Sequence, residues 1–457
     1  MAWEEVSAGY YERPFDSLEI FYRVIADAGT PLNKQHYLIS SALKFKSLPG
    51  VQTLQNAWKV LRQRYPQIAA TVKEDGSRFC YKVPTLEELE AWETESFIVD
   101  NGSSANEKYE NEPPSSKFLL FVLPEKRELL FRMPHWRIDG IGLMDLQNIF
   151  LQILANGVPE TIHFDGSEAK NLHLSLDEAA GVPTTMTEAT SKAADEELAY
   201  FTDNQPSINI PTLPNVIPTT PRRLEVKFSA DATKRVISAC KARNFSVTTA
   251  IHAALVVATL PFAEHGFDPA TRGQGGGKYT GFNAIDLRKY LSPPYNGPAA
   301  AASIYHTGLP ISVNLDLCKG FDAISASMSK DYKRKLNKDE PRNLFRFMSE
   351  YVGKVLIALG AQPEDPLRAA AHPELSSIGI INDHVLAKHE GPATTVEVED
   401  WWIAIECINR LLLTNVWTWN DEMVLSANWN AAFYEDEFVS RFLNEWKEVV
   451  LESLGAN

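Results

Sequence analysis

The sequence predicts a mixed α+β protein made of two lobes, and three observations lead to this class. Segments of strand type occur in runs in both halves of the chain, instead of alternating strictly with helices. Segments with apolar residues at helical spacing lie between these runs. A proline-rich stretch, typical of a stiff linker, separates the halves. We therefore expect an N-terminal lobe at 1–203, a linker at 204–222 and a C-terminal lobe at 223–457.

The N-terminal segments predict two helices and three strands. Apolar residues at helical spacing indicate helices at 15–25 and 51–65, and Pro66 ends the second because proline cannot continue a helix. Strand-type composition places one strand between these helices and a pair of strands after them. The predicted strands are 35–45, 68–73 and 78–83.

The next segments predict a buried strand pair followed by a helix. Apolar runs at 117–124 and 128–133 are joined by a charged turn, and helical spacing begins at 140 and continues to 154. The polar stretch 100–116 predicts a surface loop, and 179–200 leads into a short helix.

The second half repeats the mixture of strands and helices. The predicted strands are 223–229, 303–313, 378–381, 401–408 and 411–419, and the predicted helices are 230–243, 246–260, 344–359 and 437–454. The glycine-rich segment 271–278 predicts a flexible loop, because it lacks the glycine spacing of phosphate-binding loops.

Composition limits the class of partner. A net charge of -15 argues against nucleic acid, because phosphate binding needs a basic surface. The four cysteines are far apart, so they predict reduced thiols and neither a zinc site nor a disulfide framework. We find no apolar signal segment at the N-terminus and no apolar run long enough for a membrane span. We therefore expect a cytoplasmic protein, and a monomer.

One short motif carries most of the chemical information. Residues 135–140 read His-x-x-x-Asp-Gly, between the second predicted buried strand and the helix that follows. A chain with 10 histidines carries this pattern by chance in roughly 0.03 of cases. A purely structural interpretation makes Asp139 the N-cap of the helix and satisfies His135 through the backbone. The catalytic interpretation makes His135 a general base, because a neutral imidazole accepts a proton near neutral pH.

The rest of the motif predicts how the histidine is supported. Asp139 is expected to anchor the loop through an arginine rather than to bond the imidazole, and Gly140 to let the backbone turn beneath His135. Arg288 is the first candidate for a bidentate pair with Asp139 across the two halves, and Arg64 is the second. A local ion pair between Arg288 and Asp286 is an equally open alternative.

These motifs together resemble the acyltransferase superfamily of plant BAHD enzymes, chloramphenicol acetyltransferase and peptide-synthetase condensation domains. Within it the chain is most similar to fungal O-acyltransferases of the trichothecene 15-O-acetyltransferase type. The matching stretches are 135–140, 283–288 with Pro293-Pro294, and 376–379. The Asp-Phe-Gly-Trp-Gly motif of plant enzymes is absent, since the comparable region reads Ile-Gly-Ile-Ile-Asn-Asp at 378–383.

The resemblance implies two lobes with a tunnel between them and His135 midway along it. It implies transfer of an acyl group, expected to be acetyl, from acyl-CoA to a hydroxyl of a fungal-type secondary metabolite, directly and with no metal. Alternatives in the same fold are a condensation-like enzyme that forms an amide or catalyses a cyclisation, and a binding protein without chemistry. Arg137 would either alter the tunnel or contact a CoA phosphate.

Candidates for the remaining roles come from strands that are expected to line the tunnel. A hydroxyl donor for the oxyanion is sought among the serines and threonines there, although a hydroxyl on a strand is usually structural. The tryptophan cluster that includes Trp402 would line an acceptor pocket or, alternatively, pack the core. The hydroxyl candidates are Ser376, Ser377, Thr414 and Thr418.

Overall fold

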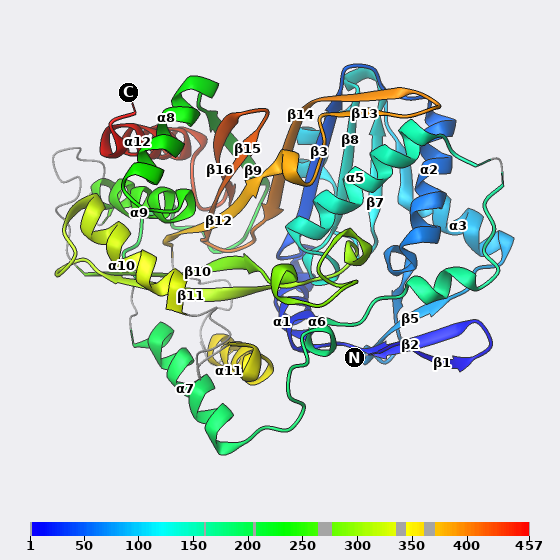
Figure 1. Cartoon of the computed structure of the whole chain (residues 1–457), viewed down its shortest axis with the longest axis horizontal. Coiled ribbons are helices and arrows are strands. Elements are labelled where there is room, and N and C mark those ends of the chain that lie inside the picture. The colour runs from blue at the N-terminus through cyan, green and yellow to red at the C-terminus, as the bar shows by residue number, and fades with distance from the viewer. Residues whose placement is uncertain are drawn as a thin grey trace. The chain divides into compact units, whose positions relative to one another are not determined.

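The computed structural model describes residues 2–159, 161–203, 207–263, 277–334, 344–360 and 371–456. These residues form several sheets covered by helices, which confirms the predicted α+β class (Figure 1). The glycine-rich segment 271–278 lies almost entirely outside the described residues, as do residues 204–206 of the predicted linker.

The chain divides into two compact units that differ from the predicted linear lobes. The first unit contains Met1–Val182, Asp286–His306 and Ile381–Ile405, and the second contains Pro183–Ile285, Thr307–Ile380 and Glu406–Asn457. Two late segments therefore return to the first unit. They do so because strand pairing and side-chain contacts hold them there, which linear sequence reasoning does not reveal.

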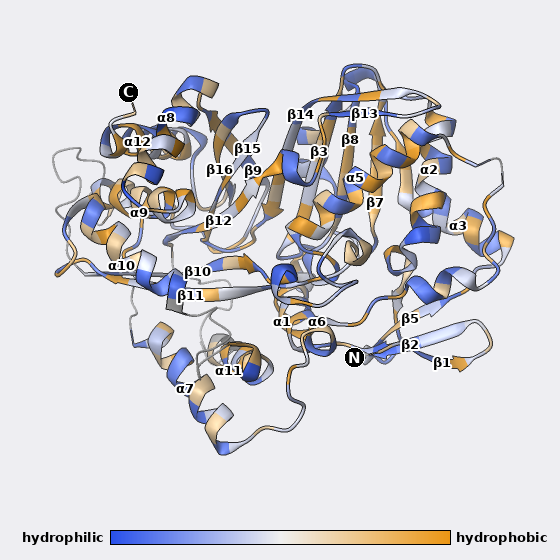
Figure 2. Ribbon diagram, in the orientation of Figure 1, coloured by the Kyte–Doolittle hydropathy of each residue, from blue (hydrophilic) through white to orange (hydrophobic). Residues whose placement is uncertain are grey.

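A six-stranded sheet is the centre of the first unit, and its strands follow the order β13-β14-β3-β8-β7-β6. The late strand β14 lies beside β3, and the Ser41 hydroxyl of β3 donates to the Trp402 carbonyl of β14 at 2.8 Å. Every side chain of β7 is buried, and Figure 2 shows this part of the sheet as strongly apolar. The bounds are β3 Leu38–Phe45, β6 Phe97–Val99, β7 Leu119–Leu123, β8 Glu128–Pro134, β13 Lys388–Glu390 and β14 Thr395–Glu406.

A smaller sheet of the first unit has the strand order β1-β2-β5-β4. The predicted strand at 68–73 is reduced to β4, because Pro66 starts a 3-10 turn that ends at Ala69. The bounds are β1 Glu4–Ser7, β2 Tyr10–Pro14, β4 Thr71–Val72 and β5 Arg78–Lys82. The helices of this unit are α1 Ser17–Asp27, α2 Val51–Arg64, α3 Leu86–Ser96, α4 Ala105–Asn111, α5 Gly140–Asn156 and α6 Leu176–Ala179.

The predicted loop at 100–116 is wrong in its centre, where α4 forms. Ser104 and Glu107 make reciprocal bonds of a capping box at its start, which satisfies backbone donors that a helix leaves open. Tyr109 anchors the helix, since its side chain is buried and donates to the Ile405 carbonyl at 3.3 Å. The sequence did not reveal α4, because most of its residues are polar and only one side of the helix is buried.

The second unit is built on a four-stranded sheet with the order β12-β15-β16-β9, in which β12 and β15 are parallel. Helices α8, α9 and α12 pack with this sheet around a continuous apolar core. The strands of this sheet are β9 Pro221–Lys227, β12 Pro373–Ile380, β15 Leu412–Trp419 and β16 Glu422–Asn430. A separate two-stranded sheet consists of β10 Lys278–Asp286 and β11 His306–Asn314. The helices are α7 Glu188–Thr202, α8 Ala230–Ala242, α9 Val247–Thr259, α10 Gly320–Arg334, α11 Met348–Gly360 and α12 Asp436–Leu454.

The proline-rich segment is fastened to the second unit over its described part. The backbone N–H groups of Ile208, Ile210 and Leu213 donate to carbonyls of Lys278, Ala371 and Phe433 at 2.8 to 3.0 Å. The segment is extended, as its prolines predict, but it lies along the unit rather than acting as a free spacer.

In the described part of the chain, no single helix has the length and apolar character needed to cross a membrane. One bent pair, Ala230–Ala242 with Val247–Phe262, passes the same criteria by length and composition only.

Candidate active site

His135 lies at the junction that the sequence predicts. Strand β8 ends at Pro134, a short 3-10 turn covers His135–Arg137, and α5 begins at Gly140. The His135 backbone N–H donates to the Tyr37 carbonyl at 2.9 Å. Tyr37 has a positive φ of 57°, a strained conformation for a residue with a large side chain. The backbone that carries His135 is therefore fixed from the sheet side.

The imidazole of His135 is enclosed by aromatic rings of the first unit. Its ring is stacked on Tyr22 of α1, with centroids 4.8 Å apart and an interplanar angle of 2°. His306 approaches edge-on, with its centroid 5.3 Å away. The residue is 7% exposed, so it is largely covered. Its Nδ1 is buried and has no hydrogen-bond partner among the described residues, which leaves Nε2 as the nitrogen able to meet a ligand.

Burial sets the protonation state of this ring. It lowers the pKa of His135 below the ordinary value, and the nearby backbone of His135 and Ile138, together with the Asp139 carboxylate, opposes that effect only in part. The imidazole is therefore neutral near pH 7 and able to accept a proton.

Asp139 is buried and supports the loop without bonding the imidazole. One carboxylate oxygen accepts from the Gly142 N–H at 2.6 Å and so caps α5. The other accepts from the Tyr305 N–H at 2.6 Å and from Arg288 Nη1 at 2.8 Å. Burial alone would raise the pKa of Asp139, but the charge of Arg288 together with these bonds holds it below the ordinary value.

Arg288 satisfies both alternatives left open by the sequence. Its Nη1 donates to Asp139 at 2.8 Å and to Asp286 at 3.1 Å. The contact with Asp139 uses one nitrogen and is not the bidentate pair expected. The two residues come from the two predicted halves of the sequence, but both belong to the first unit.

The glycine that this loop requires is Gly142 and not Gly140. A Cβ at Gly142 would stand 2.2 Å from the Ala301 carbonyl oxygen, which no side chain tolerates. A Cβ at Gly140 would be 3.6 Å from Ile403, an ordinary contact, and the φ of Gly140 is not positive. The predicted backbone role of Gly140 is therefore wrong, because helix α5 starts there in a conformation open to other residues.

Arg137 packs against backbone instead of facing a ligand. Its guanidinium donates to the carbonyls of Ser116, Gln67 and Ala70 at 2.6 to 2.9 Å and lies over the ring of Phe118. Burial lowers its pKa to about 9. The side chain thus ties the motif to neighbouring segments of the first unit.

Two residues of this site escaped the sequence argument. The Tyr22 hydroxyl and His306 Nε2 are 2.8 Å apart, and both rings contact His135. Tyr22 was expected only as part of a helix, and His306 only as part of a strand. The one signal was a histidine near the start of a predicted strand, and no fixed spacing links it to the motif.

The predicted hydroxyl donors all lie on β12 and β15 of the second unit. Ser377 bonds the Thr248 hydroxyl at 2.8 Å, and Thr414 is buried and donates to the Glu374 carbonyl at 2.7 Å. Ser376 and Thr418 are half-buried. Ser377 and Thr414 have structural partners, as hydroxyls on strands commonly do.

Trp402 lies on β14 of the first unit, where it packs edge-on against Tyr109 with centroids 6.2 Å apart. The side chain is 8% exposed. This environment matches the core-packing alternative for Trp402.

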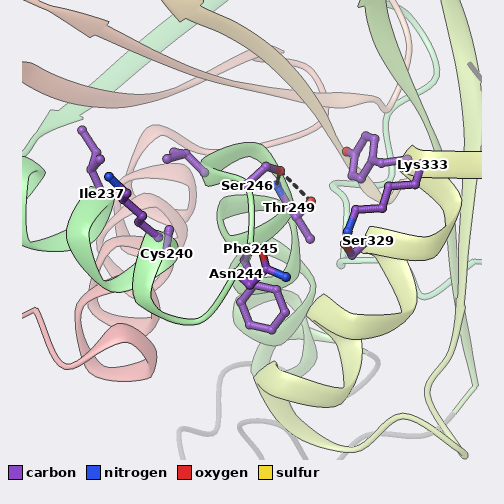
Figure 3. A pocket seen from close by; sticks show the side chains of 11 residues that line it. Ile237, Cys240, Asn244, Phe245, Ser246, Thr249, Ser329 and Lys333 are labelled. Atoms are coloured by element: carbon purple, nitrogen blue, oxygen red, sulfur yellow. Dashed lines mark hydrogen bonds between the residues drawn. The ribbon is translucent and has the colours of Figure 1, made fainter.

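A separate pocket of about 480 Å³ lies in the second unit beside the start of α9, with walls from α8 and α10 (Figure 3). Its lining includes Lys241 and Lys333. Tyr332, at its edge, bonds the buried His252 at 2.8 Å. None of the site residues predicted from the sequence lines this pocket.

Among the described residues, no group of three or more His, Cys, Asp or Glu side chains is placed to hold a metal ion.

The fold of this chain is shared with solved structures that include a fungal acetyltransferase and a peptide-synthetase domain. The solved trichothecene 15-O-acetyltransferase from Fusarium sporotrichioides superposes with a TM-score of 0.81, covering 98% of this chain and 97% of that one at 18% identity. An epimerization domain of tyrocidine synthetase superposes with a TM-score of 0.60 at 12% identity, over 97% of this chain and 98% of the domain. The suspected resemblance is therefore confirmed at the level of the fold.

Sequence comparison adds distant relatives, two of which are fungal acetyltransferases. The chain is 29% identical to the O-acetyltransferase pigM of Monascus ruber, over 99% of this chain and 87% of that protein. It is 26% identical to the acetyltransferase pigO of the same organism, over 100% of this chain and 98% of that protein. No family model matches the chain. The protein is thus a distant homologue of fungal O-acetyltransferases.

Proposed function

We propose that the protein is an O-acyltransferase that moves an acetyl group from acetyl-CoA to a hydroxyl of a secondary metabolite. The observation that carries the proposal is the neutral His135 ring at the strand-helix junction, with Nδ1 buried and Nε2 left for a ligand. The names of two distant relatives, an O-acetyltransferase and an acetyltransferase, support the same reaction class.

The proposed chemistry is a direct transfer between two bound substrates. Nε2 of His135 accepts the hydroxyl proton of the acceptor, and the oxygen attacks the thioester carbonyl to form a tetrahedral intermediate. The intermediate collapses with cleavage of the carbon–sulfur bond, and the imidazolium returns the proton to the departing CoA sulfur. The ester, free CoA and neutral His135 are then the products, with no acyl-enzyme.

Asp139 and Arg288 contribute by holding the loop rather than by touching substrate. Their buried pair fixes the start of α5 and the segment before Tyr305, two elements that flank His135. The proposal retains the tunnel implied by the resemblance as the route for acetyl-CoA and acceptor. It also retains Ser376 and Thr418 as candidate oxyanion donors, because both are half-buried hydroxyls without a hydrogen-bond partner among the described residues.

The test is a product screen with the purified full-length protein. We expect acetyl-CoA and an apolar hydroxylated acceptor to give an ester and free CoA thiol. Replacement of the hydroxyl hydrogen by acetyl makes the ester about 42 mass units heavier than the acceptor. A panel of acyl-CoAs and of amine acceptors belongs in the same screen. Transfer only to amines, or cyclisation without thiol release, would replace this proposal by the condensation-like alternative.

A further inference from the structure

The orientation of His135 is not explained by the usual partner. A catalytic histidine is commonly oriented by an acceptor on its second nitrogen, which fixes the ring and its tautomer. Here Nδ1 has no such partner in the described part of the chain. The carboxylate of Asp139 is already occupied by Gly142, Tyr305 and Arg288. A ring contact on the face of the imidazole can hold its plane instead.

Tyr22 supplies that contact. Its ring lies parallel to His135 within 2°, at a centroid separation of 4.8 Å typical of offset stacking. Tyr37 meets Tyr22 edge-on at 5.7 Å and His135 at 6.4 Å. Rotation of the imidazole out of its plane would break the stack, so this arrangement fixes the plane in which Nε2 lies.

Tyr22 is itself held at two points. It belongs to α1, whose first turn is fixed by reciprocal bonds between Asp16 and Glu19. Its hydroxyl meets His306 Nε2 at 2.8 Å. The phenol therefore has little freedom to slide across the face of His135.

The direction of the Tyr22–His306 hydrogen bond follows from the surrounding charge. His306 is buried and neutral, since burial lowers its pKa to about 3. Its Nδ1 faces Asp139 Oδ2 at 3.9 Å, and the anionic oxygen favours a proton on that nitrogen. Nε2 is then the acceptor, and the Tyr22 hydroxyl donates to it.

The same stack suits the protonated state of His135. An imidazolium over the face of Tyr22 gains a cation–π attraction, and the neutral His306 does not repel it. A charge that appears on His135 during proton transfer would therefore be stabilised by the residue that orients the ring.

We propose that Tyr22 and His306 are positioning residues for His135, with Tyr22 holding the imidazole plane and His306 locking Tyr22 in place. This inference rests on the proposed function, because it assigns His135 as the base. Four variants separate the two parts. Tyr22→Phe keeps the stack and loses the hydroxyl, and Tyr22→Leu loses both. His306→Gln keeps an acceptor near the Nε2 position, and His306→Phe removes it.

We expect Tyr22→Leu to lower kcat by about 100-fold, as a misplaced catalytic group does, with little change in KM for acetyl-CoA. Tyr22→Phe should lower kcat by about tenfold, the scale of one lost hydrogen bond. His306→Phe should match Tyr22→Phe, and His306→Gln should recover part of the loss. The acid limb of kcat/KM should move to higher pH in Tyr22→Leu, because the exposed imidazole regains its ordinary pKa.

Tyr65 offers the matched control, since its hydroxyl also donates within the first unit, to the Pro298 carbonyl at 2.8 Å. Among the described residues its ring contacts His173 and makes no ring contact with His135. Tyr65→Phe and Tyr65→Leu should leave the acid limb unchanged. An NMR titration of the His135 ring gives a readout that needs no turnover. A rise of its pKa in Tyr22→Leu but not in Tyr65→Leu supports the inference even if no acyl transfer is found. An unchanged titration and an unchanged acid limb in Tyr22→Leu would overturn it.

Discussion

Asp139 and Arg288 are 149 positions apart in the chain and form an ion pair at 2.8 Å whose side chains are 2% and 4% exposed. Because a buried charge without its partner is costly, the pair holds together the histidine motif and the segment before Tyr305. The surroundings of His135 therefore depend on residues that never touch a substrate.

Removal of the carboxylate should destabilise the protein strongly. Asp139→Asn leaves the buried Arg288 with Asp286 as its remaining ion-pair partner among the described residues, and we expect a loss of about 3–5 kcal/mol in the free energy of unfolding. Denaturant titration of the purified variant measures this loss. Asp286→Asn is the matched control, because Asp286 is 32% exposed and should cost about 1 kcal/mol or less. Equal losses of stability in the two variants would contradict the claim that Asp139 is the main buried partner of Arg288.

Gly142 and Gly140 should respond oppositely to alanine. Gly142→Ala places a Cβ against the Ala301 carbonyl oxygen, and we expect a loss of about 1–3 kcal/mol from overpacking. Gly140→Ala meets only Ile403 at an ordinary distance and should be neutral or stabilising by up to about 1 kcal/mol. Thermal melts of the Gly142→Ala and Gly140→Ala variants measure this difference in stability. A destabilised Gly140→Ala variant with an unaffected Gly142→Ala variant would show that the loop requires glycine at position 140 instead.

His384 should give the first unit a pH-dependent stability. Burial alone would lower its pKa, but the hydrogen bond to Asp145 at 2.8 Å and the charge of Asp145 raise it above the ordinary value. The contribution is therefore fully present below pH 6.5, about the unfolded pKa, and is lost as pH rises through the folded pKa. We expect the difference in unfolding free energy between wild type and His384→Asn to shrink from pH 6 to pH 8. A difference that grows over this range would contradict the prediction.

Much of the site follows from local patterns in the sequence. The apolar run before His135 and the helical spacing after Gly140 place the histidine at a strand-helix junction, and Asp139 caps that helix as its type predicts. The pairing of Arg288 with Asp139 was also foreseen, although its geometry was not. These features depend on residues near one another or on a charge that must find a partner when buried.

The rest depends on packing that no local pattern encodes. Tyr22 and His306 are 284 positions apart and meet only because α1 and the start of β11 converge on His135. Helix α4 was missed because its polar residues outnumber the two that are buried, Ala105 and Tyr109. Strand β14 was expected in the C-terminal lobe but lies in the sheet of the first unit, since strand neighbours are set by the fold and not by sequence distance.

The central claim is that His135 removes a proton from the acceptor hydroxyl. The most direct measurement is the rate of ester formation by His135→Ala, compared with wild type at saturating acetyl-CoA and alongside a thermal melt. We predict a rate at least about 100-fold lower, the scale of general base catalysis, with the melting temperature preserved. A folded His135→Ala variant that forms the ester at the wild-type rate would contradict the account.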